Sequence, residues 1–331
     1  MPGSTNAVPL DTERLERRLA PLAVGNLRPL DGGASSLTFV GSTDAASGGT
    51  KVVVKVAPPG VAPVLHRDVL RQARLLRALR HSAVPVPEVL WEDEGDPPDV
   101  PPLFVMEFVE GTSFEPLFDP GHDEDEATVA EAARSAARTL AALHALDPAV
   151  LGLSREAVVG PAEEIERWCR PLRTVDPALA PGWEEVAEGL AGAVPAAAAP
   201  TIVHGDFRLG NLLRDGSRVT AVVDWEIWSV GDPRVDLGWF LTNADPATYR
   251  RETRYATTFP SPDELAEEHA SVLGRALPSL AWFRALACFK SAATWSLIVK
   301  HNRRRPEPDP ELEAMAGALP HLLERATELL A

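Results

Sequence analysis

The chain has 331 residues, 45% of them hydrophobic, which is enough for one two-lobed enzyme or two modest domains with a sizeable core. Its formal net charge of −16 argues against a nucleic-acid partner, because phosphate backbones are bound by basic surfaces. Two widely separated cysteines, Cys169 and Cys288, favour a reducing cytoplasm, and no apolar run in the sequence approaches the roughly 20 residues of a membrane helix.

A segment of small residues at positions 31–36 lies between two β-like stretches near the N-terminus. Gly33, Ser35 and Ser36 in this segment would let backbone N–H groups approach a phosphate closely. The segment is therefore a candidate nucleotide-binding loop, although a plain Gly-rich hairpin has the same composition.

The next strand is predicted at residues 51–56, where β-branched valines dominate. Lys55 stands between valines, so it is a candidate for an inward-facing lysine that neutralises the α and β phosphates of a nucleotide. Lys51 is on the same face by parity, but it lies at the start of the strand and is more readily solvated. The apolar spacing after this strand predicts an amphipathic helix at residues 66–80.

Two further strands are predicted at residues 84–91 and 103–111, and after Gly111 the pattern changes from strands to helices. We therefore place a boundary there, between a nucleotide-binding lobe at residues 1–110 and a catalytic and substrate-binding helical lobe at residues 111–331. The helices predicted in the second lobe span residues 124–146, 161–173, 183–190, 263–277, 280–301 and 310–330.

The segment with the most chemical information begins at His204, directly after an apolar β-like run. Asp206 is followed by Asn211, and the next β-like run ends at Asp224. Phosphoryl transfer uses such a set, since one group orients a hydroxyl and two oxygen ligands hold Mg²⁺. This order of residues is that of a kinase catalytic loop. The alternative is a tight hairpin in which Asp and Asn are turn residues and Asp224 caps a helix.

The sequence resembles the aminoglycoside phosphotransferase-like family, a branch of the kinase-like fold. The resemblance is carried by HGDFRLGN at 204–211, DWE at 224–226 and GDPRVDL at 231–237, and it extends over residues 25–300. The longer pattern is similar to a subgroup found fused to acyl-CoA dehydrogenases and as stand-alone bacterial enzymes. The resemblance implies a two-lobed, protein-kinase-like α+β fold, with a small antiparallel-sheet lobe containing one helix and a larger, mainly helical lobe.

The resemblance also implies roles for individual residues. Asp206 would be the catalytic base, and Asn211 and Asp224 would hold Mg²⁺. His204 would support the catalytic loop through hydrogen bonds, and Asp236 would anchor the backbone of that loop. A further carboxylate, Glu226, would either contact the metal or face water. The tryptophans of this region are expected in the core, namely Trp225, Trp228 and Trp239.

In the resembling fold, the backbone of Glu107, Phe108 and Val109 would bind the nucleobase, so side chains do not separate ATP from GTP. The chain departs from the family at Ser36, where the family has Asn, and at Gln72, where it has Glu. A neutral amide gives Lys55 a weaker hydrogen bond than a carboxylate would. We therefore expect that either Gln72 supports Lys55 weakly or Asp68, one turn earlier, takes over.

These patterns favour an ATP-dependent, Mg²⁺-dependent O-phosphotransferase that acts on the hydroxyl of a small molecule. The acceptor would be an aminoglycoside or other antibiotic, which would confer resistance, or a hydroxyacyl-CoA-type metabolite. Its pocket would be built from residues 155–195 and 246–331. A catalytically silent nucleotide-binding protein and a metal-dependent hydrolase are the alternatives. We expect a monomer or a homodimer without nucleic-acid or membrane partners.

Overall fold

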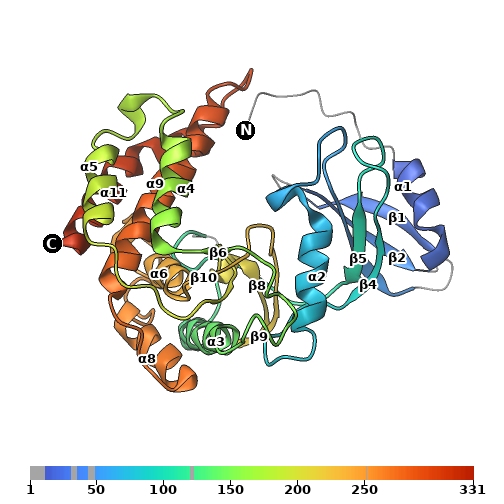
Figure 1. Ribbon diagram of the computed structural model, residues 1–331, viewed down its shortest axis with the longest axis horizontal. Coiled ribbons are helices and arrows are strands. Elements are labelled where there is room, and N and C mark those ends of the chain that lie inside the picture. The colour runs from blue at the N-terminus through green and yellow to red at the C-terminus, as the bar shows by residue number, and fades with distance from the viewer. Residues whose placement is uncertain (1–11, 31–35, 44–48, 120–122, 251) are drawn as a thin grey trace. The chain divides into compact units, whose positions relative to one another are not determined.

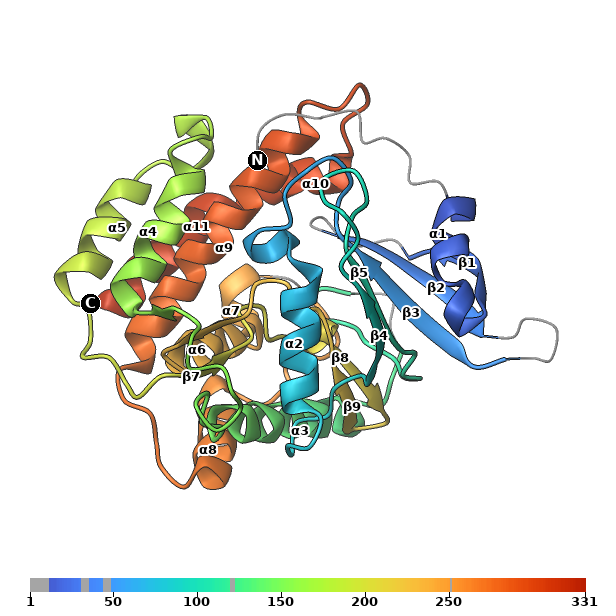
Figure 2. The same cartoon turned by 45° about the vertical axis from the view of Figure 1, so that its right-hand side comes forward.

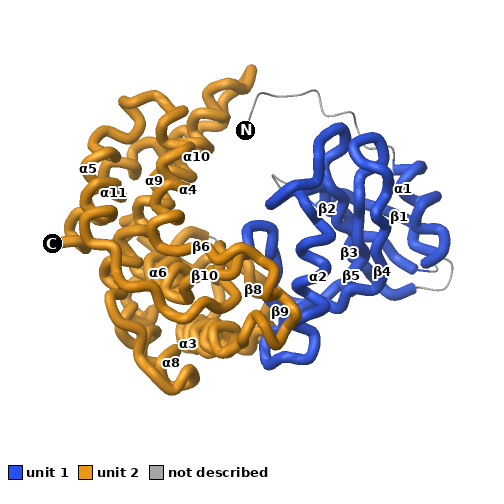
Figure 3. Tube along the Cα trace, viewed as in Figure 1, with its two compact units in different colours: residues 1–111, 220–228 blue, residues 112–219, 229–331 orange. Residues whose placement is uncertain are grey.

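The structure is a computed structural model that describes residues 12–30, 36–43, 49–119, 123–250 and 252–331 (Figure 1). The chain divides into two compact units (Figure 3). Residues 1–111 with 220–228 form the N-terminal unit, and residues 112–219 with 229–331 form the C-terminal unit. The functional division of the chain between residues 110 and 111 stays a prediction.

The N-terminal unit is built on a five-stranded sheet in the order β1-β2-β3-β5-β4, in which every neighbouring pair is antiparallel. The predicted N-terminal antiparallel sheet is therefore confirmed. The elements of the unit are α1 (Thr12–Arg18), η1 (Ala20–Leu22), β1 (Val24–Pro29), β2 (Leu37–Thr43), β3 (Lys51–Val56), η2 (Leu65–Arg67), α2 (Val69–Leu79), β4 (Val89–Asp93) and β5 (Leu103–Glu107).

β3 is the central strand of this sheet, between β2 and β5. Val52, Val54 and Val56 are fully buried in one hydrophobic cluster, as expected for β-branched residues in a central strand. Lys55 lies on the opposite side of the pleat from these valines because successive side chains of a strand alternate. The valine pattern of β3 thus fixes the face of the sheet on which Lys55 lies.

α2 lies alongside the sheet, against β4 and β5 (Figure 2). The helix begins where the Asp68 carboxylate accepts a hydrogen bond from the backbone N–H of Arg71 at 3.0 Å. Gln72, one turn later, is buried. Asp68 therefore caps the helix, and Gln72 lies on its buried face.

The C-terminal unit is mainly helical, as predicted, and contains a short sheet in the order β6-β10-β7 and the β8-β9 hairpin, along which the chain leaves the unit. None of the helices in the described part of the chain combines the length and apolarity needed to cross a bilayer. The longer elements are α3 (Glu126–His144), α4 (Pro161–Leu172), α5 (Trp183–Gly192), α6 (Arg234–Asn243), α8 (Pro262–Leu273), α9 (Leu280–Asn302) and α11 (Leu319–Leu330). The shorter ones are β6 (Val158–Val159), η3 (Pro177–Leu179), β7 (Thr201–Val203), η4 (Leu209–Asn211), β8 (Leu212–Asp215), β9 (Arg218–Val222), β10 (Ser229–Gly231), α7 (Pro246–Tyr249), α10 (Pro310–Ala314) and η5 (Met315–Ala318).

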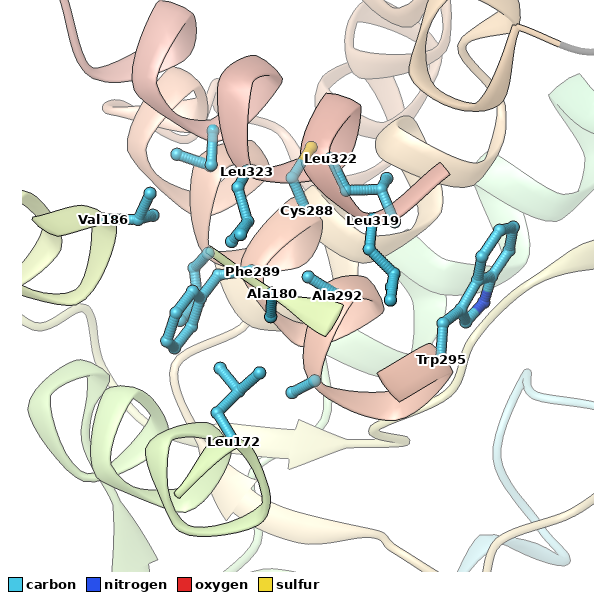
Figure 4. Packing of buried hydrophobic residues seen from close by; sticks show 14 of the residues in the cluster. Leu172, Ala180, Val186, Cys288, Phe289, Ala292, Trp295, Leu319, Leu322 and Leu323 are labelled. Carbon is cyan, nitrogen blue, oxygen red and sulfur yellow. The ribbon is translucent and has the colours of Figure 1, made fainter. Parts of the chain in front are cut away.

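α9 is the central helix of the C-terminal unit and packs against α4, α5, α6 and α11. Because it is covered on most sides, buried residues occur all around it instead of along one stripe. Phe289 and Ala292 of α9 meet Leu319 and Leu322 of α11 in one hydrophobic cluster of this unit (Figure 4). This core fixes the position of α9 in the unit.

The contact between α6 and α9 is especially close at Gly238. A Cβ atom added to Gly238 would lie 2.7 Å from the backbone carbonyl carbon and oxygen of Phe283. No real side chain fits there without moving the backbone of one helix. A glycine at this position of α6 therefore sets the separation of the two helices.

Replacement of Gly238 by Ala should lower the free energy of unfolding by about 1–3 kcal/mol, because the methyl group must push α6 away from α9. Denaturant-induced unfolding measures this change. Gly192→Ala is the matched control, since a Cβ added there at the end of α5 meets nothing within 4 Å. Equal stabilities of the two variants would contradict the close α6–α9 contact.

Candidate active site

The turn that precedes Asp206 is held by a single buried carboxylate, that of Asp236 in the first turn of α6. The backbone N–H of His204 donates to Asp236 Oδ2 at 2.5 Å, and that of Gly205 donates to Oδ1 at 2.8 Å. Gly205 has φ +88°, a conformation that glycine adopts without strain. Asp236 is thus the anchor of the loop backbone that the sequence led us to expect.

Asp236 is fully buried, and His144 Nε2 of α3 lies 3.7 Å from its Oδ2. Burial alone would raise the pKa of Asp236, but His144 and the Gly205 N–H outweigh it and hold the pKa below its ordinary value. His144 Nδ1 in turn lies 2.9 Å from Nε2 of His269 in α8. Burial, reinforced by His144, lowers the pKa of His269 to about 3. Asp236 is therefore ionised, and both of its oxygens can accept the backbone N–H groups of the loop.

The side chain of Asp206 is held at both of its oxygens. Trp239 Nε1 donates to Oδ1 at 2.9 Å, while Asn211 Nδ2 donates to Oδ2 at 2.9 Å and to the Asp206 carbonyl at 2.8 Å. The backbone N–H of Asp206 donates to His204 Nδ1 at 3.1 Å. The Asp206 side chain is nevertheless 25% exposed. It is an oriented carboxylate that solvent can still reach.

An ion-pair chain extends from Asp206 to Glu115. Arg208 Nε donates to Asp206 Oδ2 at 3.3 Å, and Arg208 Nη1 donates to Glu115 Oε1 at 2.8 Å. The same Glu115 oxygen accepts the backbone N–H of Gly210 at 2.7 Å. Burial raises the pKa of Glu115 despite Arg208. Burial would lower the pKa of Arg208, but Asp206 and Glu115 more than reverse this and raise it. Glu115, which lies in a different segment of the chain, therefore supports the loop between Asp206 and Asn211.

In the N-terminal unit, Lys55 is buried and meets two oxygen atoms. Its Nζ donates to Gln72 Oε1 at 3.3 Å and to Asp224 Oδ1 at 3.4 Å. Asp224 belongs to this unit because residues 220–228 return to it, and Val222 N–H donates to the Pro85 carbonyl at 2.8 Å. Gln72, and not Asp68, is therefore the residue of α2 that contacts Lys55.

The backbone of Asp224 is in the left-handed region, with φ +65°. This conformation is uncommon for residues other than glycine, although aspartate adopts it more often than most, and such backbone conformations cluster at functional sites. The Asp224 side chain is 39% exposed, so part of its carboxylate faces solvent while the rest contacts Lys55. The geometry marks Asp224 as a candidate functional residue independently of the sequence motif.

The other residues predicted to bind nucleotide lie in the segment at 31–36 and at the end of β5. Gly33 and Ser35 lie outside the described residues, and Ser36 is buried. The backbone N–H of Glu107 donates to the Glu88 carbonyl at 2.9 Å, so this group is already used. A nucleobase that binds this segment would take its donor from Phe108 or Val109.

The donor chemistry fits Mg²⁺ bound together with nucleotide phosphates. Within the described ranges, no group of three or more His, Cys, Asp or Glu residues is arranged to hold a metal ion by itself. Mg²⁺ does not need such a cage, because it is usually held by one or two protein oxygens, phosphates and water. The Asn211 nitrogen faces Asp206, which leaves the amide oxygen as the atom that could face a cation.

A pocket of about 480 Å³ lies in another part of the C-terminal unit. It is lined by His144, Glu156, Val158 and Arg275, among others, but not by Asp206 or Asn211. We therefore do not assign the acceptor to this pocket.

Four residues of the site were missed or misjudged from the sequence, namely Glu115, Arg208, Trp239 and Lys290. The last of these donates a hydrogen bond from its Nζ to the Gly205 carbonyl. Trp239 is buried, as expected, but its indole N–H also contacts Asp206. Arg208 lies within the recognised motif and could have been named as a partner of Asp206. Glu115 and Lys290 carry no local signal, because their partners are far away in the sequence.

The model of the phosphotransferase enzyme family matches residues 26–283 of the chain. The chain belongs to this family. The matched range contains Lys55, Asp206, Asn211 and Asp224, which the geometry already marks.

Curated relatives are larger proteins. Mouse acyl-CoA dehydrogenase family member 10 is 28% identical over 193 residues, which cover 57% of this chain and 18% of that protein. Chicken acyl-CoA dehydrogenase family member 11 is 28% identical over 293 residues, covering 82% of this chain and 36% of that protein. The chain thus spans only a minor part of the length of these relatives.

Solved structures share the fold. A Ralstonia eutropha JMP134 protein, provisionally assigned as an aminoglycoside phosphotransferase, has a TM-score of 0.77 at 23% identity, covering 97% of this chain and 98% of that one. The macrolide 2'-phosphotransferase MphH of Brachybacterium faecium has a TM-score of 0.59 at 23% identity, covering 93% and 98%. Aminoglycoside phosphotransferase APH(4)-Ia, in a ternary complex with ADP and hygromycin B, has a TM-score of 0.61 at 18% identity, covering 95% and 98%. The predicted kinase-like fold is confirmed.

Asp236→Asn should destabilise the protein at pH 7 by about 1–3 kcal/mol, because the amide leaves one loop N–H without an acceptor. The folded-state pKa of Asp236 is lowered, so the carboxylate stabilises the fold above its unfolded-state pKa of about 3.9. This stability is lost as the pH falls through the folded-state pKa.

The difference in free energy of unfolding between the wild type and Asp236→Asn should therefore narrow below about pH 4, as measured in denaturant titrations. Asp215→Asn, at a carboxylate that is 80% exposed, is the control. A difference that is constant from pH 7 to pH 3 would contradict the ionised anchor.

Proposed function

We propose that the chain is an ATP-dependent O-phosphotransferase that moves the γ-phosphate to a hydroxyl of a small molecule. The observation that carries the proposal is the Asp206 carboxylate, which is held at both oxygens and still 25% exposed. Such a group can accept the hydrogen bond of an incoming hydroxyl without reorganising first. The family match and the shared fold support the same reaction class.

In this proposal, Asp206 orients the hydroxyl of the acceptor and takes its proton. The hydroxyl oxygen forms a bond to the γ-phosphorus, and the bond from that phosphorus to the bridging oxygen of ADP breaks. The electron pair of the broken bond leaves with ADP, and the proton ends on the Asp206 carboxylate. Positioning and electrostatic stabilisation account for most of the catalysis in such reactions.

Lys55 would neutralise the α and β phosphates of ATP, supported by the Gln72 oxygen at 3.3 Å. Asn211 and Asp224 would supply oxygen ligands to Mg²⁺. A bound Mg²⁺ would supply positive charge that offsets the charge developing on the phosphate oxygens. GTP is an alternative donor, because the predicted nucleobase contacts are made by backbone groups.

Two acceptor classes follow from the relatives. One similar structure is a complex with hygromycin B and another is a macrolide 2'-phosphotransferase, so an antibiotic hydroxyl is one class. The curated relatives are named as acyl-CoA dehydrogenase family members, so a hydroxyacyl-CoA-type metabolite is the other. Incubation with γ-labelled ATP and a panel of antibiotics, and in parallel with a panel of hydroxyacyl-CoAs, would show which class accepts the labelled phosphate.

A catalytically silent nucleotide-binding protein is the second candidate, and the contact of Lys55 with Gln72 favours it. A neutral amide supports the lysine less strongly than the carboxylate expected from the family. Asp224 at 3.4 Å gives Lys55 one carboxylate, so the lysine still has a charged partner. Loss of transfer in an Asp206 variant that still binds nucleotide distinguishes the active protein from the silent one.

Asp206→Asn should lower kcat by about 10²–10³-fold, both for phosphotransfer and for any slow background hydrolysis of ATP. The reason is that the amide cannot take the proton of the acceptor. The affinity for Mg²⁺ and ATP should change little. Radiolabel transfer and calorimetric titration measure the two quantities. Asp215→Asn serves as the matched surface control, and transfer at the wild-type rate in Asp206→Asn would refute the assigned base.

Lys55→Met should weaken ATP binding about tenfold to hundredfold, as expected from the loss of a charged hydrogen-bond donor worth about 1.5–3 kcal/mol. Lys51→Met is the control on the same strand, since Lys51 is exposed and pairs with Glu110 at 2.9 Å. Titration with ATP and Mg²⁺ gives both dissociation constants. Equal affinities in the two variants would show that Lys55 does not contact the phosphates.

A further inference from the structure

A buried lysine, Lys290, lies in the middle of the central helix α9. Only 6% of the residue is exposed, and its helix neighbours Phe289 and Ser291 are fully buried. An ammonium group in such surroundings loses its hydration, which is unfavourable unless partners replace the water. The partners of Lys290 therefore indicate why a charged residue is present in the core.

The first partner is the loop that carries Asp206. Lys290 Nζ donates a hydrogen bond to the backbone carbonyl of Gly205, the residue before Asp206. The N–H of Gly205 is already bound to Asp236. Lys290 and Asp236 thus hold Gly205 through its carbonyl and its N–H.

The second partner is the tryptophan that binds Asp206. The Lys290 ammonium lies over the ring of Trp239, 3.6 Å from the ring centroid, and 5.4 Å from that of Trp168 on α4. A desolvated cation over an indole face is a favourable contact. The same Trp239 ring donates through Nε1 to Asp206 Oδ1 at 2.9 Å. Lys290 is therefore connected to the Asp206 carboxylate by two routes, one through the backbone and one through the indole.

We propose that Lys290 is a positioning residue for the transfer reaction, which fixes the Gly205 carbonyl and the Trp239 ring and thereby sets the orientation of the Asp206 carboxylate. The role in catalysis rests on the proposed function, because it requires Asp206 to be the base. The contact network itself does not depend on that function.

The charge of Lys290 should matter as well as its length. The charged groups that act on it are Asp206 from the loop, Asp236 from α6, and Glu164 and Arg167 from α4. α5 and α11 contribute hydrophobic residues to the cluster around α9, and the charged residues Arg325 and Glu328 of α11 act on Cys288 of α9. Burial lowers the pKa of Lys290 to about 8, although Asp206 partly opposes the shift. The ammonium form is therefore present below about pH 8 and is lost as the pH rises above it.

The decisive variant is Lys290→Met, whose side chain is one atom shorter, fills most of the same volume and carries no charge. We expect kcat to fall at least tenfold while the dissociation constant for ATP with Mg²⁺ stays within about twofold, because a small misplacement of a reacting group has a large effect on rate. The thermal unfolding midpoint should fall only slightly, since the loss of the donor to the Gly205 carbonyl is offset by the removal of a buried charge. Lys300→Met is the control on the same helix, where the lysine makes an exposed hydrogen bond to the Thr174 carbonyl.

The pH profile separates a positioning role from packing. In the wild type, kcat should decline above about pH 8, and in Lys290→Met this alkaline limb should be absent. Lys290→Ala should regain activity when ethylamine is added, in proportion to its protonated form. A Met variant with the wild-type kcat and an unchanged alkaline limb would overturn the proposal.

A measurement without turnover keeps this proposal distinct from the proposed function. The indole N–H resonance of Trp239, identified by its loss in Trp239→Phe, should shift with a midpoint near pH 8 in the wild type. It should not shift with that midpoint in Lys290→Met. If no acceptor is phosphorylated but the midpoint is present, the proposed function fails and the contact network stands. Absence of the midpoint in the wild type would overturn the network itself.

Discussion

The hydrogen bonds from two successive backbone N–H groups to the Asp236 carboxylate are the interaction on which the C-terminal part of the site depends. A fully buried carboxylate is stable only when its hydrogen bonds and charge partners replace water, and here His144 and the N–H groups of His204 and Gly205 do so. The arrangement fixes the peptide planes directly before Asp206. The backbone position of Asp206 is therefore set before any ligand binds, and Trp239 and Asn211 then orient its carboxylate.

Packing and chemistry use the same two helices. α6 contributes Asp236 to the loop backbone and Trp239, one turn later, to the Asp206 side chain. α9 contributes Lys290, which contacts the Gly205 carbonyl and the Trp239 ring. The close approach of these helices at Gly238 allows the lysine to reach the loop. In the N-terminal unit, β3 and α2 provide Lys55 and Gln72, and the chain returns to supply Asp224. Each functional side chain thus stands on a regular element or directly beside one.

The features of the structure that local sequence patterns determine could be predicted. Valine alternation identified β3, and apolar periodicity identified the helices. The spacing also predicted that Asp206, Asn211 and Asp224 form one chemical set, and this stays a prediction. It did not reveal Glu115 or Lys290, because each acts on the catalytic loop from more than 80 residues away in the chain. Nor could it choose between Gln72 and Asp68, which differ only in whether the side chain turns to the sheet or caps α2. Such choices depend on tertiary packing, which sequence periodicity does not encode.

The most direct test of this account is amide hydrogen exchange at His204 and Gly205 in the ligand-free protein, measured by NMR. If the Asp236 carboxylate holds the loop in advance, both amides should exchange as slowly as the buried amides of α9, since their opening requires loss of the anchor. Fast exchange at both positions, at the rate of exposed loop amides, would show that the loop is not held until a ligand binds and would contradict the account.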